Sequence, residues 1–166
     1  MFPFKFLVCS ISLKFIRNDY MITLIGKELA REGVSFVFYE PAEECSDCRF
    51  KASCVDSLKK GHRYTITEVR DVEQKCPIHE NDKVQVVAVE NAEFTILTDS
   101  KGVFEGSSFD FKRQGCSNKD CDYRHMCFPD GISKEEKGVY VKDLGKFKDC
   151  PKGNALVKCI VKIQDK

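Results

Sequence analysis

Residues 45–54 read CSDCRFKASC, and residues 116–127 read CSNKDCDYRHMC. Each stretch holds three cysteines. Each is followed, after a gap of just over twenty residues, by one more cysteine with proline behind it, at Cys76-Pro77 and Cys150-Pro151. A three-plus-one pattern that occurs twice predicts two small modules, each stapled by its own four-cysteine site.

The repeat extends beyond the cysteines. Residues 59–77, KKGHRYTITEVRDVEQKCP, resemble residues 136–151, EKGVYVKDLGKFKDCP: a charged pair, a glycine, an aromatic strand and Cys-Pro. A β-branched strand follows each Cys-Pro, KVQVVAVE at 83–90 and ALVKCIVKI at 155–163. The unit of triplet, strand, Cys-Pro and strand therefore indicates an internal duplication.

Strand patterns dominate the rest of the chain. MITLIG at 21–26, VSFVFYE at 34–40 and EFTILT at 93–98 favour strands, and the alternation in RYTITEV places Tyr64 and Ile66 on one face. Residues 90–92 predict a hairpin that joins the strands at 83–90 and 93–98. Helix signals are short, near residues 27–32 and beside the triplets. The expected fold is β-rich α+β, with two similar small β modules over 21–100 and 101–166.

Residues 1–20, MFPFKFLVCSISLKFIRNDY, form the least regular segment. Lys5 precedes a short apolar stretch, as in a signal peptide, but Lys14 and Arg17 follow at once without a small-residue cleavage site. Met21 opens a cleaner start, so we expect residues 1–20 to be an extension outside the fold. No apolar run approaches the roughly 18 residues that a membrane helix needs, so we expect no membrane segment.

The charge balance bears on the partners. The whole chain carries +1 and residues 1–20 carry +2, so the remainder carries −1. A body of this charge is not drawn to nucleic acid by its bulk electrostatics. Basic residues do surround the triplets, and they fit neutralisation of thiolates, docking of an acidic redox partner, or RNA binding. Aromatic residues that could stack bases lie among them: Phe50, Tyr64, Phe111 and Tyr123.

Clustered cysteines could form disulfides, a thiol redox pair or metal sites. Without a convincing export signal, disulfides are disfavoured, and a third cysteine close to each pair argues for ligands. The simplest grouping keeps each site within its own repeat, although an exchange of Cys76 and Cys150 between the triplets stays open. The predicted metal ligands are Cys45, Cys48, Cys54, Cys76, Cys116, Cys121, Cys127 and Cys150.

The identity of the metal is less sharply specified. Structural zinc is usually held by two close cysteine pairs. Three clustered cysteines with a remote Cys-Pro suit a four-iron cluster better. The sequence therefore favours two [4Fe-4S] clusters, with two Zn²⁺ ions as the alternative.

Other candidate residues have plainer interpretations. His79 and His125 lie near the cysteines and could replace one as a ligand, but a solvent-facing histidine beside a turn is the commoner case. His62 has less to recommend it, and Cys159 fits a core position on an apolar strand face. We assign no role to Cys9. No catalytic motif is present, and closed four-cysteine ligation leaves no open metal position, so an enzyme acting by itself is not expected.

The segments TLIGKELAREGVSFVFYEPAEECSDCRFKASC, GHRYTITEVRDVEQKCPIHENDKVQVVAVE and the second cluster with its DCP resemble an uncharacterised archaeal protein family, number 0179 in the UPF series. The resemblance covers about residues 21–163. It implies an archaeal, cytoplasmic protein without an established activity, whose two cysteine clusters have been suggested to be iron–sulfur redox centres. The leading hypothesis is electron transfer or redox sensing with an unknown redox partner protein. The alternative is a zinc-stabilised interaction module for RNA or a protein complex.

Overall fold

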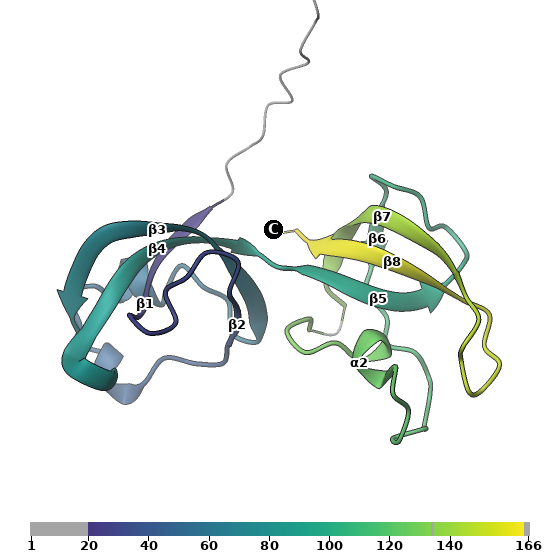
Figure 1. The fold of residues 1–166 in the computed structure, drawn as a ribbon, viewed down its shortest axis with the longest axis horizontal. Coiled ribbons are helices and arrows are strands. Elements are labelled where there is room, and N and C mark those ends of the chain that lie inside the picture. Colours follow the sequence, from purple (N-terminus) through teal and green to yellow (C-terminus); the bar gives the residue numbers. More distant parts are fainter. Residues whose placement is uncertain (1–19, 134, 165–166) are drawn as a thin grey trace, which may run out of the picture.

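The computed structural model describes residues 20–133 and 135–164 of the chain. All but the last residue of the predicted 1–20 extension, including Cys9, lies outside these residues. Two four-stranded antiparallel sheets lie side by side (Figure 1), so the β-rich prediction is confirmed. In the part of the chain that is described, no helix has the length and apolar character to cross a membrane.

Sheet A has the strand order β1-β4-β3-β2. Its strands are β1 (Met21–Gly26), β2 (Ser35–Phe38), β3 (His62–Lys75) and β4 (Lys83–Asn91). Two register shifts interrupt the β3–β4 ladder, between Ile66 and Glu68 and between Val69 and Glu73. Because bulges bend a strand and increase its twist, this long pair curls over one face of the sheet (Figure 1).

Sheet B has the corresponding order β5-β8-β7-β6. Its strands are β5 (Glu93–Asp99), β6 (Ser108–Asp110), β7 (Lys137–Phe147) and β8 (Leu156–Ile163). The β7–β8 ladder also shifts twice, between Tyr140 and Lys142 and between Asp143 and Lys146. We refer to residues 20–91 as the first half and to the described residues of 93–164 as the second half.

The helical segments are short and lie beside the cysteines, as predicted. They are η1 (Glu43–Cys45) and α1 (Lys51–Cys54) between β2 and β3, η2 (Glu80–Asp82) between β3 and β4, and α2 (Arg124–Cys127) between β6 and β7. The helix signal at residues 27–32 is wrong, because this segment forms turns, with Gly33 at φ 81° before β2.

The hairpin predicted at residues 90–92 is also wrong. β4 pairs with β1 and β3, whereas β5 pairs with β8. The chain runs through Ala92 from one sheet into the other, so β4 and β5 follow each other almost end to end (Figure 1). Ala92 is buried and donates its N–H to the Arg63 carbonyl at 3.0 Å, which ties this crossing to β3. The chain therefore passes from sheet A to sheet B at residue 92, before the boundary predicted at residue 100.

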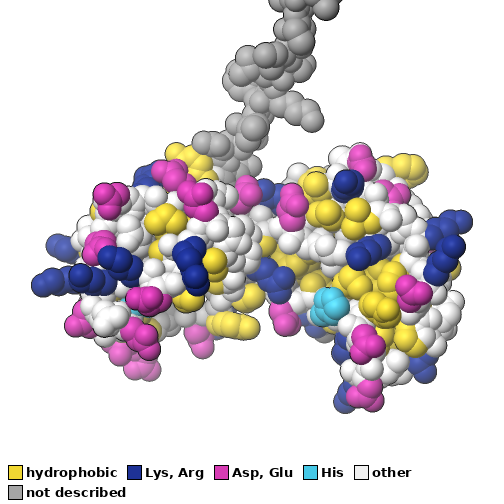
Figure 2. All heavy atoms as spheres, in the orientation of Figure 1, with side chains coloured by type: hydrophobic (Ala, Val, Ile, Leu, Met, Phe, Trp, Pro, Cys, Tyr) yellow, Lys and Arg dark blue, Asp and Glu magenta, His cyan; other side chains and the backbone are white. Residues whose placement is uncertain are grey.

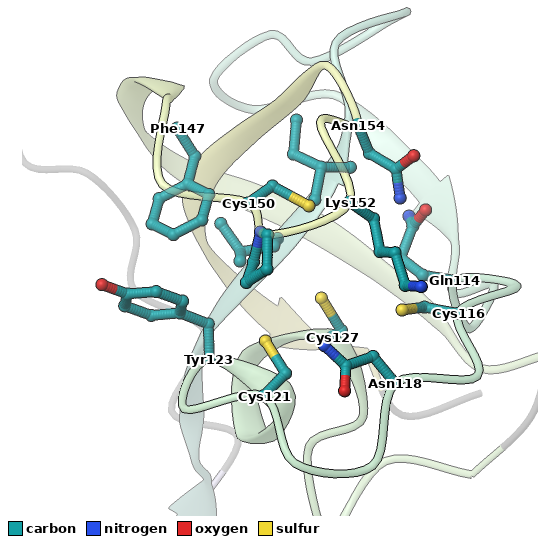
Figure 3. A pocket seen from close by; sticks show the side chains of 13 residues that line it. Gln114, Cys116, Asn118, Cys121, Tyr123, Cys127, Phe147, Cys150, Lys152 and Asn154 are labelled. Carbon is teal, nitrogen blue, oxygen red and sulfur yellow. The ribbon is translucent and has the colours of Figure 1, made fainter.

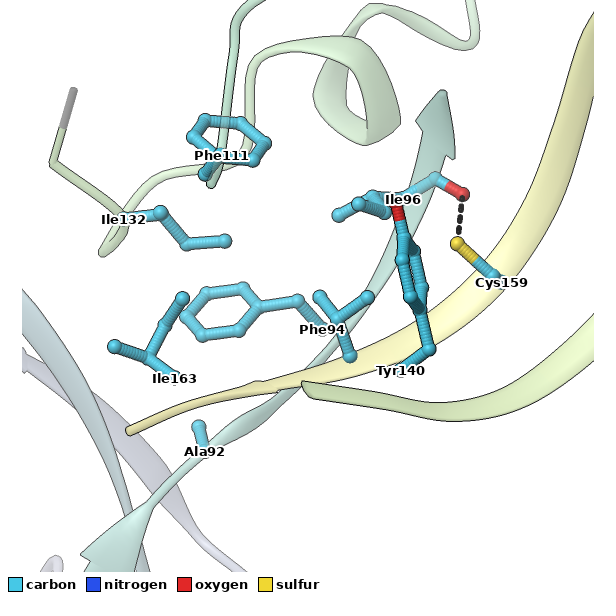
Figure 4. Close-up of a cluster of buried hydrophobic side chains, with 9 residues drawn as sticks. Ala92, Phe94, Ile96, Phe111, Ile132, Tyr140, Cys159 and Ile163 are labelled. Carbon is cyan, nitrogen blue, oxygen red and sulfur yellow. Dashed lines mark hydrogen bonds between the residues drawn. The ribbon is translucent and has the colours of Figure 1, made fainter. Parts of the chain in front are cut away.

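Each sheet has its own hydrophobic core. The core of sheet A contains Leu58, Tyr64, Ile66, Val87 and Val89, and Tyr64 and Ile66 share a buried face as predicted. Figure 4 shows the core of sheet B, in which Phe94, Ile96 and Tyr140 pack with Cys159. The predicted inward face of β8 is confirmed, because Val157, Cys159, Val161 and Ile163 are all buried.

Polar contacts join the two halves. His62 Nε2 lies 3.1 Å from Glu136 Oε1, and both side chains are largely buried. Lys162 Nζ lies 2.7 Å from Glu90 Oε2 at a more exposed position. The Arg63 N–H donates to the Gly131 carbonyl at 3.3 Å. A Cβ atom on Gly131 would lie 2.6 Å from the Arg63 Cβ, so this close approach of the halves requires glycine.

Candidate metal centres

The first set of predicted ligands lines one cavity, which we call cavity A. Cys45 ends η1, Cys54 ends α1, and Cys76 follows the last residue of β3. Together with Cys48, their side chains form part of the cavity wall. The Phe50 N–H donates to Cys48 Sγ at 3.4 Å, and Cys54 Sγ donates to the Leu24 carbonyl at 3.7 Å, so the local turn and β1 orient two of the four sulfurs.

The second set lines cavity B. Cys127 ends α2, and Cys150 follows β7 after a short link. Figure 3 shows the sulfur atoms of Cys116, Cys121, Cys127 and Cys150 directed toward the same space. The Arg124 guanidinium donates to the Asn118 carbonyl at 3.0 Å and lies 4.2 Å from the centre of the Phe128 ring. These contacts brace the loop that carries the triplet.

The structure thus brings each triplet together with the remote cysteine of its own repeat. Cys76 lies with the first triplet and Cys150 with the second, which is the simpler of the two groupings expected from the sequence. None of the nine described cysteines forms a disulfide. That these thiols ligate a metal stays a prediction.

One thiol of each cluster has a raised pKa. Burial is the main cause that raises the pKa of Cys54, and charge on Cys45 and Cys76 raises it further. Burial likewise raises the pKa of Cys127, followed by charge on Cys121, Cys116 and Cys150, while Arg124 opposes the shift. Crowded, partly buried thiols keep their protons when no cation is near. A metal cation would have to displace those protons.

Four thiol groups around one space form a donor set that suits either zinc or an iron–sulfur cluster. Within residues 20–133 and 135–164, no three His, Cys, Asp or Glu side chains are arranged to hold a single metal ion. The sulfurs of each set surround a volume instead. The residues fit a metal centre in their chemistry and grouping, and Cys45, Cys48, Cys54 and Cys76 would hold one while the second set would hold another.

The two cavities differ in size and closure. Cavity A has a volume of about 390 Å³ and cavity B of about 20 Å³. Around cavity B, Cys127 and Cys150 pack against a small apolar cluster of Leu97, Met126 and Leu156. In α1, by contrast, no residue is fully buried. The sequence repeat does not predict this difference.

The remaining candidate residues have distinct positions. His79 is half-buried and lines cavity A, whereas His125 is exposed and its Nδ1 lies 3.0 Å from the Asp122 carbonyl oxygen. Cys159 is fully buried in the sheet B core, as predicted. His62 joins the halves through Glu136, a role that no sequence signal indicated.

The proposed base-stacking aromatics are only partly available. Tyr64 and Phe111 are buried in the cores, so the suggestion that they stack nucleic-acid bases is wrong. The Tyr123 ring packs edge-on against Phe147 with 4.9 Å between ring centres. The Arg49 guanidinium lies 4.5 Å from the centre of the Phe50 ring. Aromatic side chains therefore support the structure around the triplets.

Comparisons with known proteins agree with the resemblance seen in the sequence. The model of an uncharacterised protein family, UPF0179, matches residues 21–161. The UPF0179 protein of Methanobrevibacter smithii is 48% identical over 139 residues, which cover 83% of this chain and 95% of the relative. That of Methanothermobacter thermautotrophicus is 46% identical over 147 residues, 88% of this chain and 99% of the relative.

The likeness also extends to relatives of lower sequence identity. The UPF0179 protein of Methanosphaera stadtmanae is 36% identical over 141 residues, 85% of this chain and 99% of the relative. No solved structure matches the chain. Because both the family model and these relatives span nearly the whole described body, the chain belongs to the UPF0179 family.

Proposed function

We propose that this protein binds two iron–sulfur clusters and acts in electron transfer or redox sensing. The observation that carries the proposal is the grouping of the thiols: each three-plus-one set lines a single cavity of its own. Cysteine thiolates are the usual ligands of iron–sulfur clusters, which supply a centre that accepts and releases single electrons. The eight cysteines would act as ligands, and the redox partner would be another protein.

The proposal includes an origin by duplication. The two sheets share the same strand order, and each long hairpin carries two register shifts. In each half, a short helix ends at the last cysteine of the triplet and precedes the strand that comes third in chain order, β3 or β7. Two modules of common descent, each with one centre, explain these correspondences.

Charge gives less support to a nucleic-acid partner. Figure 2 shows acidic and basic side chains intermingled over the visible face of both halves. Nucleic-acid binding depends on a concentrated basic surface that neutralises phosphates. We therefore propose a protein partner rather than RNA.

A second candidate is a structural zinc protein, favoured by the form of cavity B. A volume of about 20 Å³ is close to the space of one water-sized sphere, which is roughly 10–15 Å³. Two of its cysteines pack into an apolar cluster. A single ion would require the thiols to rearrange, because the described side chains are not arranged to hold one as they stand, and it would then tie β7 and α2 to the sheet without chemistry of its own.

The deciding experiment measures iron, zinc and acid-labile sulfide per chain on protein purified without oxygen. We expect iron with matching sulfide, about eight of each for two four-iron clusters. Cys54→Ser and Cys127→Ser should each remove about half of the metal, whereas Cys159→Val, which alters a buried core thiol, should remove none.

Other contents would reject the iron–sulfur proposal. Zinc near two per chain without sulfide would establish the structural alternative. Protein that holds neither metal, with its thiols oxidised in pairs, would establish the disulfide interpretation.

A further inference from the structure

Cavity A is larger than its thiols require. Its volume of about 390 Å³ falls within the roughly 300–1,000 Å³ typical of small-molecule sites. All four strands of sheet A contribute to its wall, and the four cysteines are only part of the lining. The other side chains are mostly apolar and include Leu24, Phe36, Phe38, Ile66 and Val84.

The strand registers show why the second half lacks such a space. Val84 of β4 pairs with Gln74, and at the corresponding step of sheet B Leu156 pairs with Phe147. The Phe147 ring packs against Tyr123 beside Cys150. Leu156 and Phe147 line cavity B. At the equivalent positions of the first half, Val84 is smaller than leucine and Gln74 is more polar than phenylalanine.

The short helices also carry a larger side chain in the second half than in the first. The third residue of α2, Met126, is buried against Leu97 and Leu156. The third residue of α1 is Ser53, which is exposed. With neither a methionine nor a phenylalanine to fill the space, the apolar face of sheet A stays open to cavity A.

The charges around cavity A select the kind of ligand. Lys51 and Lys75 line the cavity, and neither takes part in an ion pair with another described residue. The one carboxylate in the lining, Glu40, is paired with Lys60 at 2.6 Å. An apolar wall with two lysines that no carboxylate of the lining neutralises is complementary to an apolar molecule that carries an acidic group.

We propose that cavity A binds a small, largely apolar acid. The apolar body lies against Phe36, Phe38 and Ile66, and the acidic group lies at Lys51 and Lys75. This inference goes beyond the proposed function, because the acid would occupy the part of the cavity that remains beside a metal centre held by the four thiols. It also makes the two halves functionally unequal: the second half holds only its thiol site.

The test titrates the full-length, metal-loaded protein with anilinonaphthalene sulfonate, followed by fluorescence, and then competes the probe with octanoate or octanol. We expect one site per chain, and octanoate should displace the probe at a lower concentration than octanol. Ala42 is exposed, has an extended backbone and lines cavity A. Ala42→Phe should therefore fill the cavity and weaken probe binding about tenfold or more, a change of about 1.4 kcal/mol.

The matched control is Ala52→Phe, an equal change at an exposed position of α1 that does not line the cavity. It should bind the probe as the parent does. Gln74→Phe, which copies Phe147, places a ring opposite Val84 of the cavity lining and provides a second way to narrow the cavity. Lys51→Gln and Lys75→Gln should each weaken octanoate binding about threefold and leave octanol binding unchanged.

The outcomes separate this inference from the metal proposal, because metal content is measured on the same samples. Unchanged probe binding in folded Ala42→Phe or Gln74→Phe protein would overturn the cavity as the site. Equal binding of octanoate and octanol, insensitive to both lysines, would overturn the acidic ligand.

Discussion

The two halves of this protein share one strand order but differ in how far side chains fill the space beside the cysteines. Both place a short helix and a cysteine triplet over one face of a four-stranded sheet. In the second half Met126, Leu156 and Phe147 fill the space beneath the thiols. In the first half Ser53, Val84 and Gln74 occupy corresponding positions, and a cavity of about 390 Å³ results. In two halves of the same topology, the volume of the side chains therefore determines whether a cavity large enough for a ligand remains beside the cysteines.

Metal removal should produce the largest effect and should separate the halves. Binding of a structural metal contributes on the order of 10 kcal/mol in small metal-dependent folds. Residues 43–54 have no fully buried side chain, whereas Met126 of α2 is buried in a cluster with Leu97 and Leu156. We expect chelator-treated protein to lose amide hydrogen-exchange protection over 43–54 more strongly than over 124–127. Equal loss in both segments would show that closure of cavity B does not stabilise its loop.

Exchange of the third helix residue should give the next largest effect. Met126→Ser deletes a buried side chain from the cluster with Leu97 and Leu156 and should lower the free energy of unfolding by about 2–4 kcal/mol. The reverse change, Ser53→Met, alters an exposed residue and should stay within about 0.5 kcal/mol. Urea unfolding of both variants measures the two changes. A comparable loss in Ser53→Met would contradict the difference in packing.

Much of this architecture could be predicted from the sequence. Alternation located the strands, because a half-buried strand must place apolar residues on one face, and Tyr64 and Ile66 behave in this way. Cysteine spacing favours the grouping of Cys76 with the first triplet and of Cys150 with the second but leaves an exchange open, and each of these cysteines lines the cavity of its own repeat. These features depend on neighbours along the chain or on a repeated pattern.

Other features depend on contacts that no local pattern records. The crossing at Ala92 resembles a hairpin turn in sequence, because strand periodicity does not tell which strand is the partner. The unequal cavities depend on Gln74 and Phe147, which correspond only when the register shifts of both hairpins are known. His62 and Glu136 are 74 residues apart, so their pairing follows from the packing of one half against the other.

Loss of the contacts between the halves should lower the free energy of unfolding by a smaller amount, which depends on how buried each contact is. His62→Ala would leave the largely buried Glu136 carboxylate without its partner and should cost about 1–3 kcal/mol. Lys162→Ala removes the partner of Glu90 at a more exposed position and should cost less than about 1 kcal/mol. Thermal unfolding with a double-mutant cycle for each pair checks the order. If the Glu90–Lys162 coupling were the larger, the junction would be held mainly at its surface.

One effect appears only at alkaline pH and concerns Cys159, whose equivalent position in sheet A is occupied by Val87. Burial raises the pKa of the Cys159 thiol to about 11 from an ordinary 9.0, with a further contribution from Asp143. The folded protein therefore holds this proton more tightly than the unfolded chain. The resulting stability is fully present below pH 9 and is lost as the pH rises toward 11.

Between pH 8 and pH 10 the loss from this one thiol should be about 1.3 kcal/mol. Cys159→Val, which copies the residue of sheet A, should remove that part of the pH dependence and leave stability at pH 8 nearly unchanged, because valine fills a similar apolar volume. Urea unfolding of the parent and the variant at both pH values measures the difference, and the other titrating lysines and tyrosines are common to both. If the two proteins lost stability equally, the alkaline sensitivity would belong to those shared groups rather than to the second core.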